Sequence, residues 1–161
     1  MDGSRIYVDT SVLGGCFDAE FSMWSNGLLD DFRGGLLHPV LSDVTAEEIG
    51  RAPATVRAVH EELVTLGAEI VGVSPEVLAL VAAYEARAIL GPRYRNDLLR
   101  IALATVAAVD ALVSWNFRHI VRLDRIQRFN EVNIALGRGS LAIYSPREVT
   151  THGRNEIDSG S

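Results

Sequence analysis

The chain has 161 residues, a hydrophobic content of 48%, one cysteine and a formal net charge of −6 at pH 7. The length suits one domain with its own core, and the hydrophobic content excludes a chain that is disordered throughout. The single cysteine excludes an intramolecular disulfide and a cysteine-based zinc site. The sequence shows no secretory signal pattern and no apolar run long enough to span a bilayer, so we expect a cytoplasmic protein without membrane attachment.

Strand and helix patterns alternate along the chain, which is typical of an α/β fold with a mainly parallel sheet. Apolar, β-branched runs predict strands near residues 5–9, 37–41, 69–73, 111–115 and 141–144. Helical periodicity and capping residues predict helices after residue 10, at 21–32, from 46, at 53–66, 75–90 and 97–109, and over 118–128. We expect residues 1–149 to form one domain and the polar segment 150–161 to be a disordered tail.

Four residues with oxygen-bearing side chains flank these elements: Asp9, Glu48, Asp97 and Asn116. Asp9 and Asn116 follow predicted buried strands, at the carboxyl ends where open α/β sheets place their sites. Carboxylates gathered there would bind a hard divalent cation such as Mg2+. The pattern therefore indicates metal-assisted attack on a phosphodiester. Taken alone, Asp97 favours a purely structural role, in which it stabilises the first turn of its helix, and its combination with Asp9 is what favours a site.

The ordered set of segments resembles the PIN-domain nucleases, and within them the VapC-like toxins of type II toxin–antitoxin pairs. The matching segments are 7–13 (YVDTSVL), 42–49 (SDVTAEEI), 96–104 (NDLLRIALA), 109–120 (VDALVSWNFRHI) and 145–149 (SPREV). The resemblance implies a PIN-like three-layer α/β/α fold with a mainly parallel central sheet. It also implies an endoribonuclease that depends on Mg2+ or Mn2+, acts on RNA, forms a homodimer and is inhibited by a small VapB-like antitoxin.

By this resemblance the metal-binding catalytic carboxylates are Asp9, Glu48 and Asp97. The fourth catalytic position, often Asp in the family, falls on Asn116. An amide there removes one negative charge, so we expect one firmly held ion rather than two. Thr10 or Ser11 corresponds to the hydroxyl that supports the first carboxylate or a metal-bound water.

Arg100 departs from the family pattern, because relatives with a similar Trp-Asn-Phe segment often carry His there. It follows Asp97 by three residues and therefore shares its helical face. Two roles stay open: a guanidinium directed at the scissile phosphate, or a structural ion pair. Together with Asn116, this departure supports an alternative in which the chain is a degenerate PIN fold that binds RNA or protein without catalysis.

The charges are unevenly distributed, and all 15 cationic residues are arginines. Residues 1–90 contain 14 acids and 5 arginines, a balance of −9, whereas residues 91–161 contain 7 acids and 10 arginines, a balance of +3. We therefore expect RNA contacts from the second half, at Arg93, Arg95, Arg118 and Arg122. Spacing places residues 118, 122, 125 and 128 on one helix, where a solvated face paired with acids is the alternative. By resemblance, the amphipathic helices 21–32 and 54–66 would grip the antitoxin.

Overall fold

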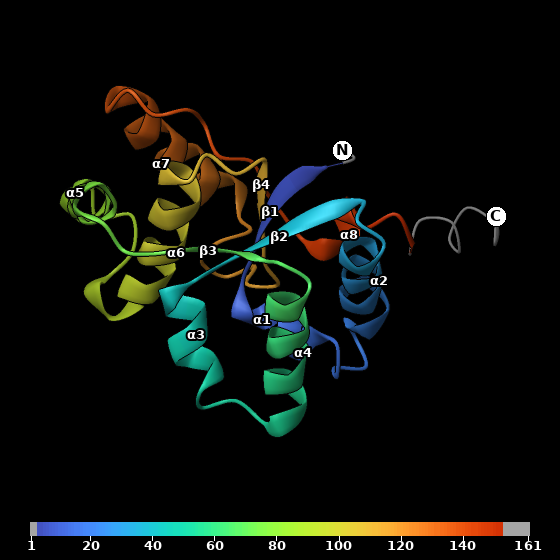
Figure 1. Cartoon of the computed structure of the whole chain (residues 1–161). Coiled ribbons are helices and arrows are strands. Elements are labelled where there is room, and N and C mark those ends of the chain that lie inside the picture. Colours follow the sequence, from blue (N-terminus) through green and yellow to red (C-terminus); the bar gives the residue numbers. More distant parts are fainter. Residues whose placement is uncertain (1–2, 153–161) are drawn as a thin grey trace.

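A five-stranded, fully parallel sheet forms the centre of the protein, with strand order β3-β2-β1-β4-β5 (Figure 1). The computed structural model describes residues 3–152. The strands are β1 (Ser4–Val8), β2 (Leu37–Ser42), β3 (Glu69–Val71), β4 (Ala111–Val113) and β5 (Ile143–Tyr144). All five strands predicted from the sequence are thus present, and each ends within three residues of the expected position.

Helices cover both faces of this sheet. They are α1 (Thr10–Gly15), α2 (Ser22–Arg33), α3 (Asp43–Ile49), α4 (Ala54–Thr65), α5 (Pro75–Ala86), α6 (Arg95–Val106), α7 (Leu123–Ala135) and α8 (Pro146–Val149), with a short 3-10 turn η1 (Pro92–Tyr94). Helices α5, α6 and α7 pack on one face, and α1, α2, α4 and α8 pack on the other. Among the helices within residues 3–152, none has the length and apolar character needed to cross a membrane.

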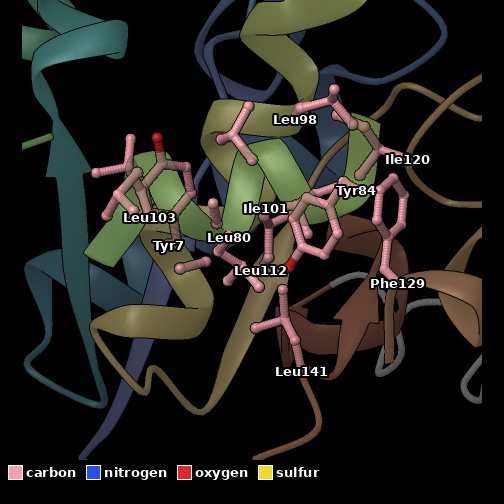
Figure 2. Packing of buried hydrophobic residues seen from close by; sticks show 14 of the residues in the cluster. Tyr7, Leu80, Tyr84, Leu98, Ile101, Leu103, Leu112, Ile120, Phe129 and Leu141 are labelled. Atoms are coloured by element: carbon pink, nitrogen blue, oxygen red, sulfur yellow. The ribbon is translucent and has the colours of Figure 1, made fainter. Parts of the chain in front are cut away.

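Alternation along the strands divides the core into two layers. In β1 the side chains of Ile6 and Val8 join the cluster beneath α1, α2 and α4, whereas Tyr7 joins the cluster beneath α5, α6 and α7. Figure 2 shows this second cluster, in which residues of α6 pack between the sheet and α5. Helix α6 is buried along most of its length, because its residues 98–104 are all apolar except Arg100.

Two predicted helix starts were wrong. Helix α3 begins at Asp43, three residues before the expected start, because the Ser42 hydroxyl accepts a hydrogen bond from the Thr45 N–H and caps the helix. Helix α6 begins at Arg95, two residues before the expected start at residue 97, because the turn η1 leads directly into it. Both changes lengthen a helix at its amino end and leave its side-chain phase unaltered.

The arginine series at 118–128 does not lie on one helix. Helix α7 begins at Leu123, so Arg118 lies in the preceding turn and Arg122 at the N-cap. The guanidinium of Arg128 donates to the Arg87 carbonyl oxygen at 2.7 Å. Helical spacing alone therefore overestimated how far this row of charges extends.

The segment after α8 is attached to α2 for at least three residues, whereas the sequence predicted that a tail begins at residue 150. The carboxylate of Asp31 on α2 accepts hydrogen bonds from the Thr150 hydroxyl at 3.0 Å and the Thr151 hydroxyl at 2.7 Å. His152 Nε2 lies 3.2 Å from the same carboxylate. The rest of the predicted tail, 153–161, lies outside the described residues.

Candidate active site

Parallel strands place the first predicted site residue at the carboxyl edge of the sheet. Asp9 follows the last residue of β1, and its amide donates to the Val113 carbonyl oxygen at the end of β4. Ser114 is the next residue after β4 and Ser42 ends β2. The central strand and both of its neighbours therefore present polar side chains at one edge, as expected of an open α/β sheet.

Three carboxylates converge at this edge on the guanidinium of Arg100. Arg100 Nε lies 2.6 Å from Asp9 Oδ1, and Arg100 Nη1 donates to Asp97 Oδ1 at 2.6 Å. Arg100 Nη2 donates to Glu48 Oε2. The carboxylates come from the end of β1, from α3 and from α6, so the tertiary fold brings Asp9, Glu48 and Asp97 together.

Each carboxylate is also held through its second oxygen. Asp9 Oδ2 accepts hydrogen bonds from the hydroxyls of Ser11 and Ser114, both at 2.7 Å. Glu48 Oε1 accepts from the Thr10 hydroxyl at 2.8 Å. The second oxygen of Asp97 lies 3.3 Å from Nδ1 of His119, on the turn after β4. These partners fix the orientation of the carboxylates independently of Arg100.

The cluster has a strong negative potential, because three carboxylates face one guanidinium and leave a formal charge of −2. Burial, with the nearby Asp9 carboxylate, raises the pKa of Asp97 above its ordinary value, although the Arg100 charge acts in the opposite direction. Burial disfavours the charged form of Arg100, but the surrounding carboxylates outweigh burial and raise its pKa. The site therefore favours cations.

The donor chemistry fits a hard divalent ion, since carboxylate oxygens are its preferred ligands. Asp9 Oδ1 and Arg100 Nε are buried and make no hydrogen bond within the described residues, although they lie 2.6 Å apart, so this oxygen is available to a better-placed cation. Across residues 3–152, however, no group of three or more His, Cys, Asp or Glu side chains is already spaced around a common metal position. The guanidinium lies between the carboxylates, and an ion needs that space.

Asn116 does not join this convergence. Its side-chain oxygen accepts hydrogen bonds from the backbone N–H groups of Arg118 and His119, at 3.1 and 3.0 Å, and so closes the turn after β4. Asp110, the acidic residue just before β4, lies at the opposite edge of the sheet and accepts a hydrogen bond from the Arg5 N–H. Glu47 is exposed and pairs with an arginine one turn further along its helix.

Sequence reasoning missed two residues of the cluster, Ser114 and His119. The signal that could have found Ser114 is its position directly after β4, which places its hydroxyl beside Asp9 at the end of the neighbouring strand β1. His119 gives no such signal, because the four histidines of the chain show no ligand spacing. Its role depends on the turn that Asn116 closes, and that turn brings the imidazole to Asp97.

Basic and aromatic side chains border the carboxylates on the His119 side. The Tyr94 ring packs on the His119 ring with centroids 4.0 Å apart, and the Arg93 guanidinium lies 5.4 Å from the centroid of Tyr94. Arg118 is exposed on the adjoining turn. The other two predicted RNA contacts are paired with acids, Arg95 with Glu85 and Arg122 with Asp124.

An aromatic pocket of about 450 Å³ lies on the other side of the β4 turn. Its lining includes Trp24, Trp115 and Phe117, and Phe21 stacks on Trp115 with ring centroids 4.1 Å apart. Phe117 is half exposed. The pocket is connected to the carboxylates through the backbone, because the Trp115 N–H donates to the hydroxyl of Ser11, which holds Asp9.

The sequence matches no protein-family model and no curated protein. The fold is similar to solved structures of VapBC2 from Rickettsia felis bound to a promoter DNA fragment (TM-score 0.57, 14% identity, 88% of this chain and 98% of that chain). It is also similar to VapBC-1 from nontypeable Haemophilus influenzae (TM-score 0.56, 14%, 89% and 98%) and to FitAB bound to a DNA fragment (TM-score 0.55, 16%, 88% and 94%). These similarities confirm the expected PIN-like three-layer α/β/α fold.

Proposed function

We propose that this chain is a PIN-domain endoribonuclease of the VapC-like toxin type, which hydrolyses RNA phosphodiester bonds with a divalent ion held by Asp9, Glu48 and Asp97. The observation that carries the proposal is the convergence of these three carboxylates, from β1, α3 and α6, at the carboxyl edge of the sheet. The shared fold with the VapBC and FitAB structures supports it. A Mg2+ or Mn2+ ion bound there would supply charge neutralisation of the phosphate and a lowered pKa of a bound water.

The side chains around the carboxylates would keep them in position during the reaction. Ser11 and Ser114 hold one oxygen of Asp9, so its other oxygen faces the site with little freedom to rotate. The Glu48 side chain is about a quarter exposed (27%), whereas those of Asp9 and Asp97 are largely buried (5% and 12%). Glu48 is therefore the carboxylate best placed to accept a proton from an incoming water.

The surroundings of the site suit single-stranded RNA. Arg93 and Arg118 would contact the phosphate backbone near Asp97, with Arg95 and Arg122 contributing less because each already pairs with an acid. The half-exposed ring of Phe117 offers a face on which an unpaired base can stack. Arg93 and Arg118 would thereby supply positive charge near the carboxylates despite the net negative charge of the chain.

We further propose a small VapB-like antitoxin, a homodimer and a cytoplasmic location. The antitoxin proposal rests on similarity to structures named VapBC and FitAB and on the amphipathic helices α2 and α4. Arg33 at the end of α2 pairs with Glu62 of α4 at 2.6 Å, so these two helices are joined on the protein surface. Binding of a co-purified antitoxin segment to this surface would be measured by protection of α2 and α4 from hydrogen exchange.

One observation favours a second candidate, a non-catalytic RNA- or protein-binding module. Arg100 fills the centre of the carboxylates and satisfies part of their charge without a metal. A site whose centre is permanently filled by the guanidinium would bind partners but would not activate water. Dependence of cleavage on metal separates this candidate from the nuclease.

The test is cleavage of a mixed tRNA and rRNA pool by purified, antitoxin-free protein with Mg2+ or Mn2+, compared with EDTA. The nuclease proposal predicts cleavage that needs metal and is lost in Asp97→Asn. Asp110→Asn is the matched control, because this aspartate lies at the opposite edge of the sheet. Folded wild-type protein that cleaves no RNA under any of these conditions would support the binding module instead.

A further inference from the structure

The guanidinium of Arg100 occupies the point on which Asp9, Glu48 and Asp97 converge. We propose that Arg100 is a built-in substitute for the divalent ion: it holds the carboxylates together in the metal-free protein and must leave their centre before an ion binds. The inference rests on the nuclease function proposed above and adds to it a competition between one side chain and the metal.

The first argument is that the carboxylates keep their positions without Arg100. Ser11 and Ser114 bind the second oxygen of Asp9, and Thr10 binds the second oxygen of Glu48. His119 contacts the second oxygen of Asp97. Departure of the guanidinium therefore exposes one oriented oxygen from each carboxylate, which is a prepared site for an ion rather than a collapsed one.

The second argument is charge. Three carboxylates and one guanidinium leave a formal charge of −2, whereas the same carboxylates around a divalent ion would have a formal charge of −1. Because the groups are largely buried, solvent screens this difference poorly. A divalent ion consequently neutralises the site better than Arg100 does.

The third argument is geometry at the two ends of the guanidinium. At the buried end, Arg100 Nε and Asp9 Oδ1 are close but make no hydrogen bond, and neither atom has another partner in the described part of the chain. At the opposite end, Nη2 donates to Glu48, which is the most exposed of the three carboxylates. An ion can therefore enter beside Glu48 and replace a poorly aligned contact with Asp9.

Competition predicts a reduced apparent metal affinity. If Arg100 fills the centre for nine-tenths of the time or more, the apparent dissociation constant of the ion is raised about tenfold or more. Removal of the guanidinium should then strengthen metal binding and weaken the metal-free fold. If Arg100 only stabilised the metal-bound site, its removal would instead weaken metal binding.

The experiment is titration of Mn2+ into wild-type protein and Arg100→Met by calorimetry, with thermal melting in EDTA and in Mn2+. Methionine keeps an unbranched apolar stem and removes the charge. Arg33→Met is the matched control, because Arg33 also bridges two carboxylates, Asp30 and Glu62, but outside the site. We expect Arg100→Met to bind Mn2+ about tenfold tighter or more than wild type. In EDTA its melting temperature should be lower than that of wild type, and Mn2+ should raise its melting temperature by more. Arg33→Met should bind Mn2+ as wild type does.

Equal or weaker Mn2+ binding by Arg100→Met would overturn the inference. Should that variant fail to fold, Arg100→Gln decides, because its neutral amide can still donate to one carboxylate but carries no charge, so its Mn2+ affinity should rise, whereas unchanged affinity refutes competition. RNA cleavage by the same samples separates this inference from the nuclease proposal. Tighter metal binding without any cleavage refutes the nuclease and leaves the competition, and cleavage with unchanged affinity refutes the competition alone.

Discussion

Replacement of Asp31 by alanine tests how the segment after α8 is held against α2. Asp31 is fully buried and accepts hydrogen bonds from the hydroxyls of Thr150 and Thr151 and from the Thr151 N–H. In Asp31→Ala the exposed groups of Thr151 can turn to water, but the buried Thr150 hydroxyl loses its acceptor, which costs about 1–3 kcal/mol. The loss of the charge-assisted hydrogen bonds adds to this destabilisation. Removal of the buried carboxylate offsets part of it, because its desolvation cost disappears.

The net destabilisation expected for Asp31→Ala is about 3 kcal/mol, or roughly 6–12 °C in melting temperature for a chain of this size. Asp30→Ala is the control, because the neighbouring carboxylate is exposed and pairs with Arg33 on the surface, so its loss should cost under about 1 kcal/mol. Thermal melting in EDTA measures both. A melting temperature for Asp31→Ala within about 2 °C of wild type would refute this reading of the contact.

Gly27→Ala should weaken the same contact from the other side. A Cβ at Gly27 would lie 2.8 Å from the Thr150 hydroxyl oxygen and 3.0 Å from the Cβ of His152. The overlap should cost about 1–3 kcal/mol. Because both substitutions detach one segment, the double variant Gly27→Ala/Asp31→Ala should lose less than the sum of the two single losses. Strict additivity would show that Asp31 and Gly27 act on different parts of the fold.

Three further predictions concern the surroundings of α1 and α2. Gly15→Ala would place a Cβ 2.7 Å from the indole nitrogen of Trp115. We therefore expect a loss of about 1–3 kcal/mol in stability, measured by thermal melting, and a change in tryptophan fluorescence. A variant as stable as wild type would contradict the close approach. Burial raises the pKa of the Cys16 thiol to about 11, so at pH 8 roughly one thiol in a thousand is ionised. A thiol reagent should therefore react slowly with the native protein and faster once urea unfolds the chain. Fast reaction with the native protein would be inconsistent with this burial. The hydrogen bonds from Arg33 lower the pKa of Glu62 below its ordinary value of 4.5, so this exposed pair contributes stability above pH 4.5 that is lost as the pH falls through the lowered pKa. Arg33→Gln should therefore cost under about 1 kcal/mol at pH 7 and nothing in acid, and a penalty of equal size at both pH values would exclude the ion pair as its cause.

The parts of the fold that could be predicted are those set by local patterns. Apolar, β-branched runs located every strand, and the carboxyl end of β1 located Asp9, because parallel strands end at a common edge. The helical phase of α6 put Asp97 and Arg100 on one face. Helix starts were less certain, since Ser42 and Thr45 are both capping residues and only the fold decides which of them caps α3.

The parts that could not be predicted depend on contacts between distant segments. Arg100 was expected to face Asp97, but nothing in its neighbourhood indicated that it also reaches Glu48 and Asp9. The polar composition after residue 149 favoured a tail, because a buried acceptor on α2 leaves no local signal next to Thr150. In both cases one charged side chain collects partners that the sequence alone does not bring together.

The measurement that tests the central claim most directly is the identity of the ends left by RNA cleavage in water enriched in 18O. If the carboxylates hold an ion that activates water, wild-type protein with Mn2+ should give linear terminal phosphates, each with one solvent 18O, and Asp97→Asn should give none. Mass spectrometry of the fragments resolves this. Cyclic 2′,3′-phosphate ends, or cleavage that persists in EDTA, would contradict attack by a metal-activated water at this site.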